Sequence, residues 1–121
     1  DLFVDDSEST EIIIDSMLTS FSYTELGTVL AKAVSKLRIN GRIIIYEKDI
    51  DMICHHYNKM GMGIQDINNL LFDSSSSIAS VLNTETIIDA LKQIGLKIEE
   101  QFINSETMQS IVTARRANNE N

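Results

Sequence analysis

The chain has no proline, no tryptophan and a single cysteine, Cys54, among its 121 residues. One cysteine excludes an internal disulfide and any zinc site that needs several cysteines. The sequence also lacks an apolar run near the roughly 20 residues that span a bilayer, and it has no secretory signal. We therefore expect a cytoplasmic protein or soluble domain, of a length that suits one domain with its own core.

Basic residues are absent from the first 31 positions, which hold seven acidic residues. The other 90 residues hold 11 acidic and 10 basic residues, so nearly all of the net charge of −8 lies in the first quarter. An acidic segment repels phosphate backbones, so we do not expect nucleic acid to bind there. The chain starts at Asp1 without a methionine, which favours a processed product or a piece of a longer protein.

Hydrophobic patterns in the first half predict a strand, a helix and a second strand. Residues 11–15 form a β-branched apolar run typical of strands buried on both faces of a parallel sheet. From Ser22 the period is helical, with Ser22 and Glu25 spaced as a capping box and Asn40-Gly41 as the stop. Residues 42–47 form the second strand, and the three elements make one right-handed βαβ unit.

The second half predicts three helices and a hairpin. The helices cover 49–60, capped by Asp49 or Asp51, then 64–72, and a third that begins at Asn83 or Thr84 and stops at Gly95. Strands over 96–103 and 107–115 follow, joined by a tight turn, and 117–121 form a frayed tail. We assign 1–116 to one α/β domain with an open, mostly parallel sheet, flanking helices and a C-terminal antiparallel hairpin.

This order of elements, together with one turn, resembles the class I S-adenosylmethionine-dependent methyltransferases. In that family the helix after the fourth strand ends in a turn often written Leu-Lys-Pro-Gly-Gly, and an apolar fifth strand follows. Residues 37–45 read Leu-Arg-Ile-Asn-Gly-Arg-Ile-Ile-Ile, without the proline and with Asn40 in place of the first glycine. Ile94-Gly95-Leu96 is similar to the family's junction before its last two strands. The resemblance covers only the C-terminal half of the family's domain.

The resemblance implies methyl transfer from S-adenosylmethionine to an unidentified acceptor, with four acidic residues as site candidates. Asp15 ends the first predicted strand, where ligands of open α/β sheets collect, and would orient the acceptor or the cofactor. Its alternative role is to cap the next turn through Ser16. Glu47 and Asp49 would contact the substrate, or else belong to a solvated loop or a helix cap. Asp1 would lie near the adenine of the cofactor.

The resemblance also implies that the cofactor site is incomplete in this chain. The family's first strand with its glycine-rich turn, and the acidic residue that binds the ribose, have no counterpart in this sequence. The family's fourth strand lies inside the sheet, so residues 12–14 would form an open apolar edge that proteins normally cover or pair. We therefore expect the upstream half of the same protein, or a second chain, to pair with that edge, and we expect no membrane partner.

Two other hypotheses fit the same pattern. The chain could be a non-catalytic methyltransferase-like module that serves protein interaction or assembly through its exposed sheet edge. It could also be an unrelated α/β domain, such as a receiver or a small nucleotide-binding fold, that shares only the βαβ unit. The C-terminal hairpin separates the last hypothesis from the other two.

Cys54, His55 and His56 are adjacent and invite a metal or nucleophile hypothesis. Neighbouring residues on a helix point about 100° apart, so the two histidines cannot chelate one ion, and we expect no metal site. We expect Cys54 to be buried and one histidine to be exposed. Arg115-Arg116 is predicted to be the polar end of the last strand.

Overall fold

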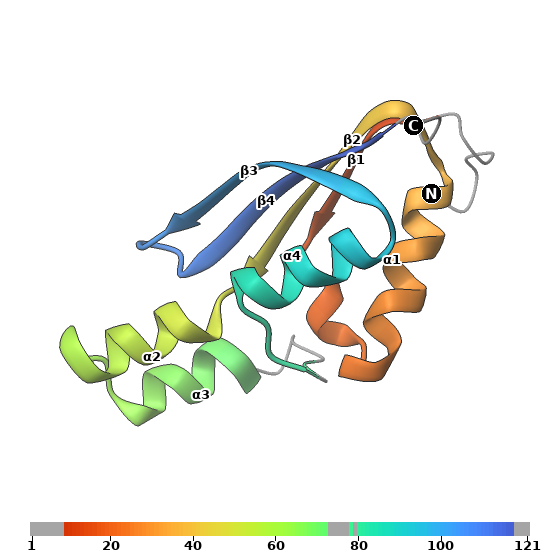
Figure 1. The fold of residues 1–121 in the computed structure, drawn as a ribbon. Helices are drawn as coiled ribbons and strands as arrows, with labels where there is room; N and C mark the ends of the chain where they lie inside the picture. The colour runs from red at the N-terminus through yellow and green to blue at the C-terminus, as the bar shows by residue number, and fades with distance from the viewer. Residues whose placement is uncertain (1–8, 73–77, 79, 118–121) are drawn as a thin grey trace.

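The structure is a computed structural model that describes residues 9–72, 78 and 80–117. Its four strands form one sheet in the order β1-β2-β4-β3 (Figure 1). The strands are β1 (Ser9–Asp15), β2 (Leu37–Lys48), β3 (Leu96–Asn104) and β4 (Gln109–Arg116). Asp1, the candidate adenine contact, lies outside the described residues.

The central strand β2 joins a parallel pair to an antiparallel hairpin. Ile12, Ile13 and Ile14 of β1 lie opposite Ile43, Ile44 and Ile45 of β2 in parallel register. Strand β2 pairs antiparallel with β4, and β4 pairs antiparallel with β3. The predicted βαβ unit and C-terminal hairpin are confirmed, and the sheet over the described residues is mixed.

Two helices cover one face of the sheet, as Figure 1 shows. They are α1 (Leu26–Ser35), preceded by the short 3-10 turns η1 (Leu18–Ser20) and η2 (Tyr23–Glu25), and α4 (Thr84–Gln93). Their inward residues, Leu30 and Leu91, pack with Ile43 and Ile45 of β2 and Val112 of β4 into the main core. Helices α1 and α4 also touch each other, so the molecule has one layer of helices on one sheet face.

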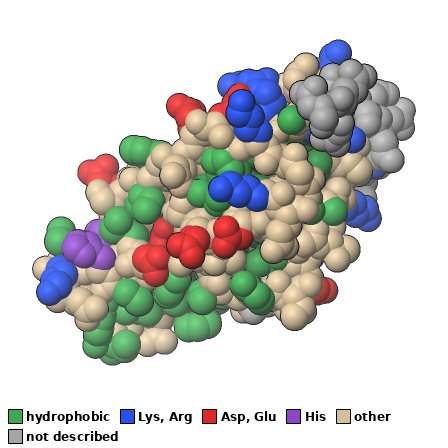
Figure 2. Space-filling model, viewed as in Figure 1, with side chains coloured by type: hydrophobic (Ala, Val, Ile, Leu, Met, Phe, Trp, Pro, Cys, Tyr) green, Lys and Arg blue, Asp and Glu red, His purple; other side chains and the backbone are tan. Residues whose placement is uncertain are grey.

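Helices α2 (Ile50–Lys59) and α3 (Ile64–Phe72) lie beyond the carboxyl end of β2 (Figure 1). Ile53 and Leu71 form a second, smaller core there with Met108. Hydrophobic side chains gather on the surface over these two helices in Figure 2, and Met60 and Ile64 are each 64% exposed. This helix pair therefore joins the sheet through a small core and leaves an apolar surface uncovered.

The segment between α1 and β2 differs from the sequence prediction. The sequence predicts a helix that ends at Asn40-Gly41. In the structure α1 ends at Ser35 and β2 begins at Leu37. Leu37 already pairs with Ser9 of β1, so sheet hydrogen bonding outweighs helical periodicity at this point. Asn40 takes a φ of 70°, a left-handed conformation that asparagine tolerates, within this strand.

Burial of Cys54 was also predicted wrongly. Ile53 is 2% exposed, whereas Cys54 is exposed. One residue turns a helix by about 100°, so the residue after the inward-facing Ile53 points away from the small core. The described residues contain no cluster of three histidine, cysteine, aspartate or glutamate side chains that could hold a metal ion. None of their helices is long and apolar enough to cross a membrane.

Two glycines provide a matched test of this fold. A Cβ added to Gly41 would lie 2.8 Å from Leu37 Cδ1 and 2.9 Å from the Arg38 carbonyl oxygen, whereas a Cβ at Gly27 in α1 would meet nothing within 4 Å. We expect Gly41→Ala to lower the free energy of unfolding by about 1 to 3 kcal/mol. Gly27→Ala should raise it by about 0.5 to 1 kcal/mol because alanine favours the helix. Urea denaturation measures both, and equal effects would contradict the close approach at Gly41.

Candidate functional site

The carboxyl ends of strands β1 and β2 lie side by side, and Asp15 at the end of β1 is opposite Tyr46 of β2. The Asp15 side chain is exposed, and its Oδ1 accepts a hydrogen bond from Ser16 Oγ at 3.0 Å. Ser16 has a φ of 59°, and its amide donates to the Tyr46 carbonyl at 2.8 Å, so the chain turns sharply across the end of β2. Asp15 thus caps the turn, and its carboxylate remains open to solvent.

Glu47 lies on the inward face of β2, with the same side-chain direction as Ile43 and Ile45, and is 0% exposed. Its Oε2 accepts hydrogen bonds from the amides of Met17 and Leu18, both at 2.9 Å. These amides open the short η1 turn, where unpaired N–H groups favour a carboxyl oxygen. Glu47 therefore fastens the segment after β1 to the end of β2.

Burial raises the pKa of Glu47 above its usual value of 4.5. The amides of Leu18, Met17 and Thr19 favour the charged form and oppose this shift, while the negative charge of Asp15 adds to it. Desolvation is the largest effect because the side chain is shielded from solvent. The structure therefore brings two of the predicted residues, Asp15 and Glu47, close enough for the charge of one to act on the other.

Asp49 is 1% exposed and forms the N-cap of α2. Its Oδ1 accepts from the amides of Asp51 and Met52, at 2.8 and 3.3 Å. Its Oδ2 accepts from Ser110 Oγ at 2.7 Å and from Thr84 Oγ1 at 3.0 Å. Asp49 thus ties together the starts of α2 and α4 and the start of β4, and both of its oxygens are engaged.

A small cavity lies near the carboxyl end of β2. The cavity beside Thr19, Lys48, Ile53 and Ser80 has room for about one water molecule. Of the three described candidates, Asp15 offers an exposed carboxylate, and Met17 beside it is 56% exposed. Among the described residues, the carboxyl ends of β1 and β2 therefore present an open surface with Asp15 exposed on it.

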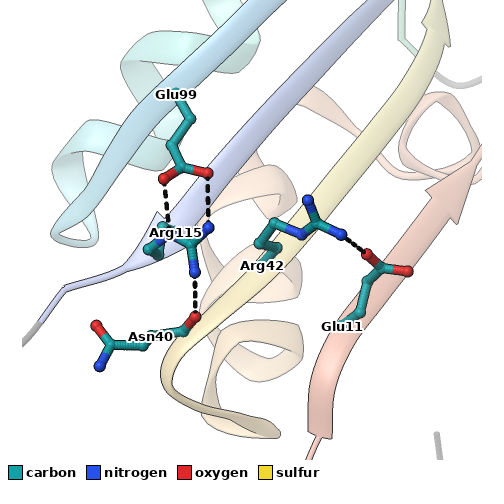
Figure 3. Close-up of polar contacts among 5 residues, drawn as sticks. All are labelled: Glu11, Asn40, Arg42, Glu99 and Arg115. Atoms are coloured by element: carbon teal, nitrogen blue, oxygen red, sulfur yellow. Dashed lines mark hydrogen bonds and ion pairs between the residues drawn. The ribbon is translucent and has the colours of Figure 1, made fainter.

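Arg115 and Arg116 hold the chain at the opposite end of β2. Arg115 makes two hydrogen bonds to Glu99, at 2.6 and 3.2 Å, and a third to the Asn40 carbonyl at 2.5 Å (Figure 3). The bond from Arg115 lowers the pKa of the Glu99 carboxyl. Arg116 donates to the carbonyls of Val34 and Leu37, where α1 gives way to β2. These contacts were not predicted from the sequence, because they depend on the register in which the strands pair and on how the chain end meets α1 and β2.

Comparison with known proteins finds likeness in structure alone. No protein-family model matches the sequence, and no curated protein matches it significantly. An O-methyltransferase family 2 protein from Planctomyces limnophilus, in complex with apigenin, is 18% identical and covers 97% of this chain with a TM-score of 0.67. A 1,6-didemethyltoxoflavin-N1-methyltransferase from Burkholderia thailandensis, with 1,6-didemethyltoxoflavin and S-adenosylhomocysteine bound, is 11% identical and covers 94% with a TM-score of 0.65.

A SAM-dependent methyltransferase from Archaeoglobus fulgidus is 10% identical and covers 93% of the chain, with a TM-score of 0.63. The chain has the fold of the C-terminal part of a class I methyltransferase. It spans 33% of the Planctomyces chain, 46% of the Burkholderia chain and 61% of the Archaeoglobus chain. At these identities the likeness shows the methyltransferase fold and does not identify a reaction.

Within this methyltransferase fold, Glu47 is a buried anchor, and strand alternation in the sequence could have predicted its burial. Position 47 has the same parity as the apolar positions 43 and 45, so strand alternation alone places its side chain inward. A carboxyl group at an inward position requires hydrogen-bond donors, which the turn after β1 supplies. Parity was the available clue that Glu47 anchors a turn.

Replacement of Glu47 should change how stability depends on pH. Because burial raises the folded-state pKa, folding favours the protonated acid, and this contribution is complete below pH 4.5. It is lost as pH rises from 4.5 through the folded-state pKa. We expect the free energy of unfolding of the wild type to fall relative to that of Glu47→Gln across this interval, by at most about 1.4 kcal/mol per pH unit.

Urea denaturation of both proteins from about pH 3 to about pH 8, which brackets the usual carboxyl pKa values of about 4, measures the difference. Subtracting the curve of Glu47→Gln removes the contributions of the other carboxyl groups, which the two proteins share. A difference that stays constant over this range would show that folding does not perturb the ionisation of Glu47.

Proposed function

We propose that this chain forms the C-terminal half of an S-adenosylmethionine-dependent methyltransferase-like domain. The observation that supports this most directly is the order β1-β2-β4-β3, with one parallel pair followed by an antiparallel hairpin. This arrangement superposes on methyltransferase structures over more than nine-tenths of the chain. In methyl transfer the protein mainly aligns donor and acceptor and excludes water, and this chain would supply one wall of that site.

The solvent exposure of the acidic side chains guides the role that we propose for each of them. Asp15 is the exposed carboxylate at the shared end of β1 and β2, and it would orient the acceptor or the cofactor. Asp1 would lie near the adenine. Glu47 and Asp49 remain candidates for substrate contact, although their described hydrogen bonds are to the protein itself. The methyl donor would be S-adenosylmethionine, and the acceptor is unidentified.

Weak binding of the demethylated cofactor tests the proposal. With millimolar S-adenosylhomocysteine, we expect amide chemical-shift changes at residues 15–19 and 47–49, because half of a site binds weakly but at a defined place. Asp15→Asn should reduce them, and Asp89→Asn, which removes an exposed carboxylate from α4, should not. Shifts that are absent, or that cluster away from the ends of β1 and β2, would argue against cofactor binding by this half.

The partner in this proposal pairs with β1. Strand β1 is at the edge of the sheet, with β2 on one side and no described strand on the other. Ile13 is 57% exposed on this edge strand. An apolar edge with free backbone groups favours pairing with another strand. The occupant would be the upstream half of the same protein or a second chain, and the second case would give a non-catalytic assembly module.

Sedimentation of the isolated chain separates these two cases. For an assembly module we expect a dimer at a protein concentration of about 100 µM, which exceeds the dissociation constant of a complex in the micromolar range. Ile13→Lys would place a charge on the edge and yield a monomer. Ile64→Lys is the matched control, since Ile64 on α3 is also largely exposed, at 64% against 57% for Ile13. A monomeric wild type, or a dimer that survives Ile13→Lys but not Ile64→Lys, would count against assembly through β1.

A further inference from the structure

The two carboxyl oxygens of Glu47 differ in their hydrogen bonding. One carboxyl oxygen, Oε2, accepts both hydrogen bonds, from the amides of Met17 and Leu18. The other, Oε1, is buried and has no hydrogen-bond partner within the described part of the chain. A buried oxygen that carries charge and lacks a donor costs several times more free energy than a neutral one.

The neutral acid costs less to bury at this position than the carboxylate, because the loss of solvent outweighs the preference of the amides for the charged form. A carbonyl oxygen has two lone pairs, so Oε2 can accept from both amides when the proton is on Oε1. Loss of that proton leaves a negative charge without solvent, beside the negatively charged Asp15. For water to reach the ionised Glu47 side chain, the segment of residues 16–20, whose amides are bonded to it, has to move.

The groups around Glu47 offer no compensating positive charge among the described residues. From β1 and its turn the charged neighbour is Asp15, and η1 presents backbone amides. From β4 the residue across the strand is Ser110, whose hydroxyl is bonded to Asp49. Helix α4 turns Ile87 inward, while its Glu85 and Asp89 are exposed. Lys48, the next residue along β2, points to the other face of the strand.

We propose that Glu47 is a proton-operated latch, which holds residues 16–20 against the end of β2 when Oε1 carries a proton and releases them when that proton is lost. The released segment carries Met17, and it begins at Ser16, whose φ of 59° already marks a sharp turn. Release would therefore move the surface next to Asp15. This inference concerns the chain's own turn and does not depend on methyl transfer.

Amide hydrogen exchange of Met17 and Leu18 tests the latch. Corrected for the intrinsic exchange rate, protection of these two amides should be constant below pH 4.5. Above it, protection should fall by up to about tenfold per pH unit until the pKa of the closed state is reached, because opening then releases one proton. Amides of Ile45 and Val112 in the core serve as references for global unfolding.

Two variants complete the test. In Glu47→Gln the side-chain oxygen still accepts from both amides but cannot titrate, so the extra pH dependence should vanish. Asp15→Asn removes the negative charge that raises the pKa of Glu47, so the fall in protection should end at a lower pH. Wild-type protection of Met17 and Leu18 that only follows the core amides, or a pH dependence that persists in Glu47→Gln, would overturn the latch. The wild-type and Asp15→Asn measurements decide the matter if Glu47→Gln does not fold.

Discussion

Two buried carboxyl groups at the end of β2 determine how the segments around it are arranged. Glu47 and Asp49 both face inward, two residues apart in the chain, and neither can exist there without hydrogen-bond donors. The donors for Glu47 come from the turn after β1, and those for Asp49 come from the starts of α2, α4 and β4. Three segments distant in sequence, together with the adjacent start of α2, are thus held at one strand end.

The opposite end of the sheet is held by cations instead. Arg115 and Arg116 close the last strand, and their guanidinium groups bind carbonyl oxygens at the end of α1 and in the first residues of β2. Arg42 lies next to them in the sheet and forms an ion pair with Glu11 of β1 at 2.6 Å (Figure 3). Exposed ion pairs of this kind contribute little energy on their own. Arg115 also binds the carbonyl of Asn40, a residue with a left-handed φ of 70°, and so fixes the geometry of the chain at this end.

Local signals in the sequence predicted much of this fold. Asn83 caps α4 through a 2.8 Å bond to the Thr86 amide, Asp49 caps α2, and Gly95 takes a φ of 90° at the end of α4. Glu25 accepts from the Ser22 amide at 3.0 Å, as the capping-box spacing predicts. Each of these depends on residues close to one another in the chain. The first turn of that helix is nevertheless 3-10, a boundary detail that spacing does not determine.

The site was harder to predict because it depends on pairings between distant residues. Asp15, Glu47 and Asp49 were correctly placed at strand ends, but their exposure separates them: the first is open to solvent, and the other two are buried. A set of acidic residues at strand ends cannot show this difference. Strand parity predicts it for Glu47, whereas the burial of Asp49 follows from Ser110 and Thr84, which only the folded chain brings near.

The two faces of the sheet differ in how far their apolar side chains are buried. The face that carries Ile43, Ile45 and Val112 is covered by α1 and α4, and these residues are fully buried. On the other face Ile13 and Phe102 are 57% and 59% exposed, and Phe102 lies opposite Ile111 in the hairpin register. Runs of three isoleucines in β1 and β2 match a sheet that is covered on both sides. Over the described part of the chain, one layer of helices satisfies half of that pattern, and Ile13 of the edge strand β1 lies on the half that stays exposed.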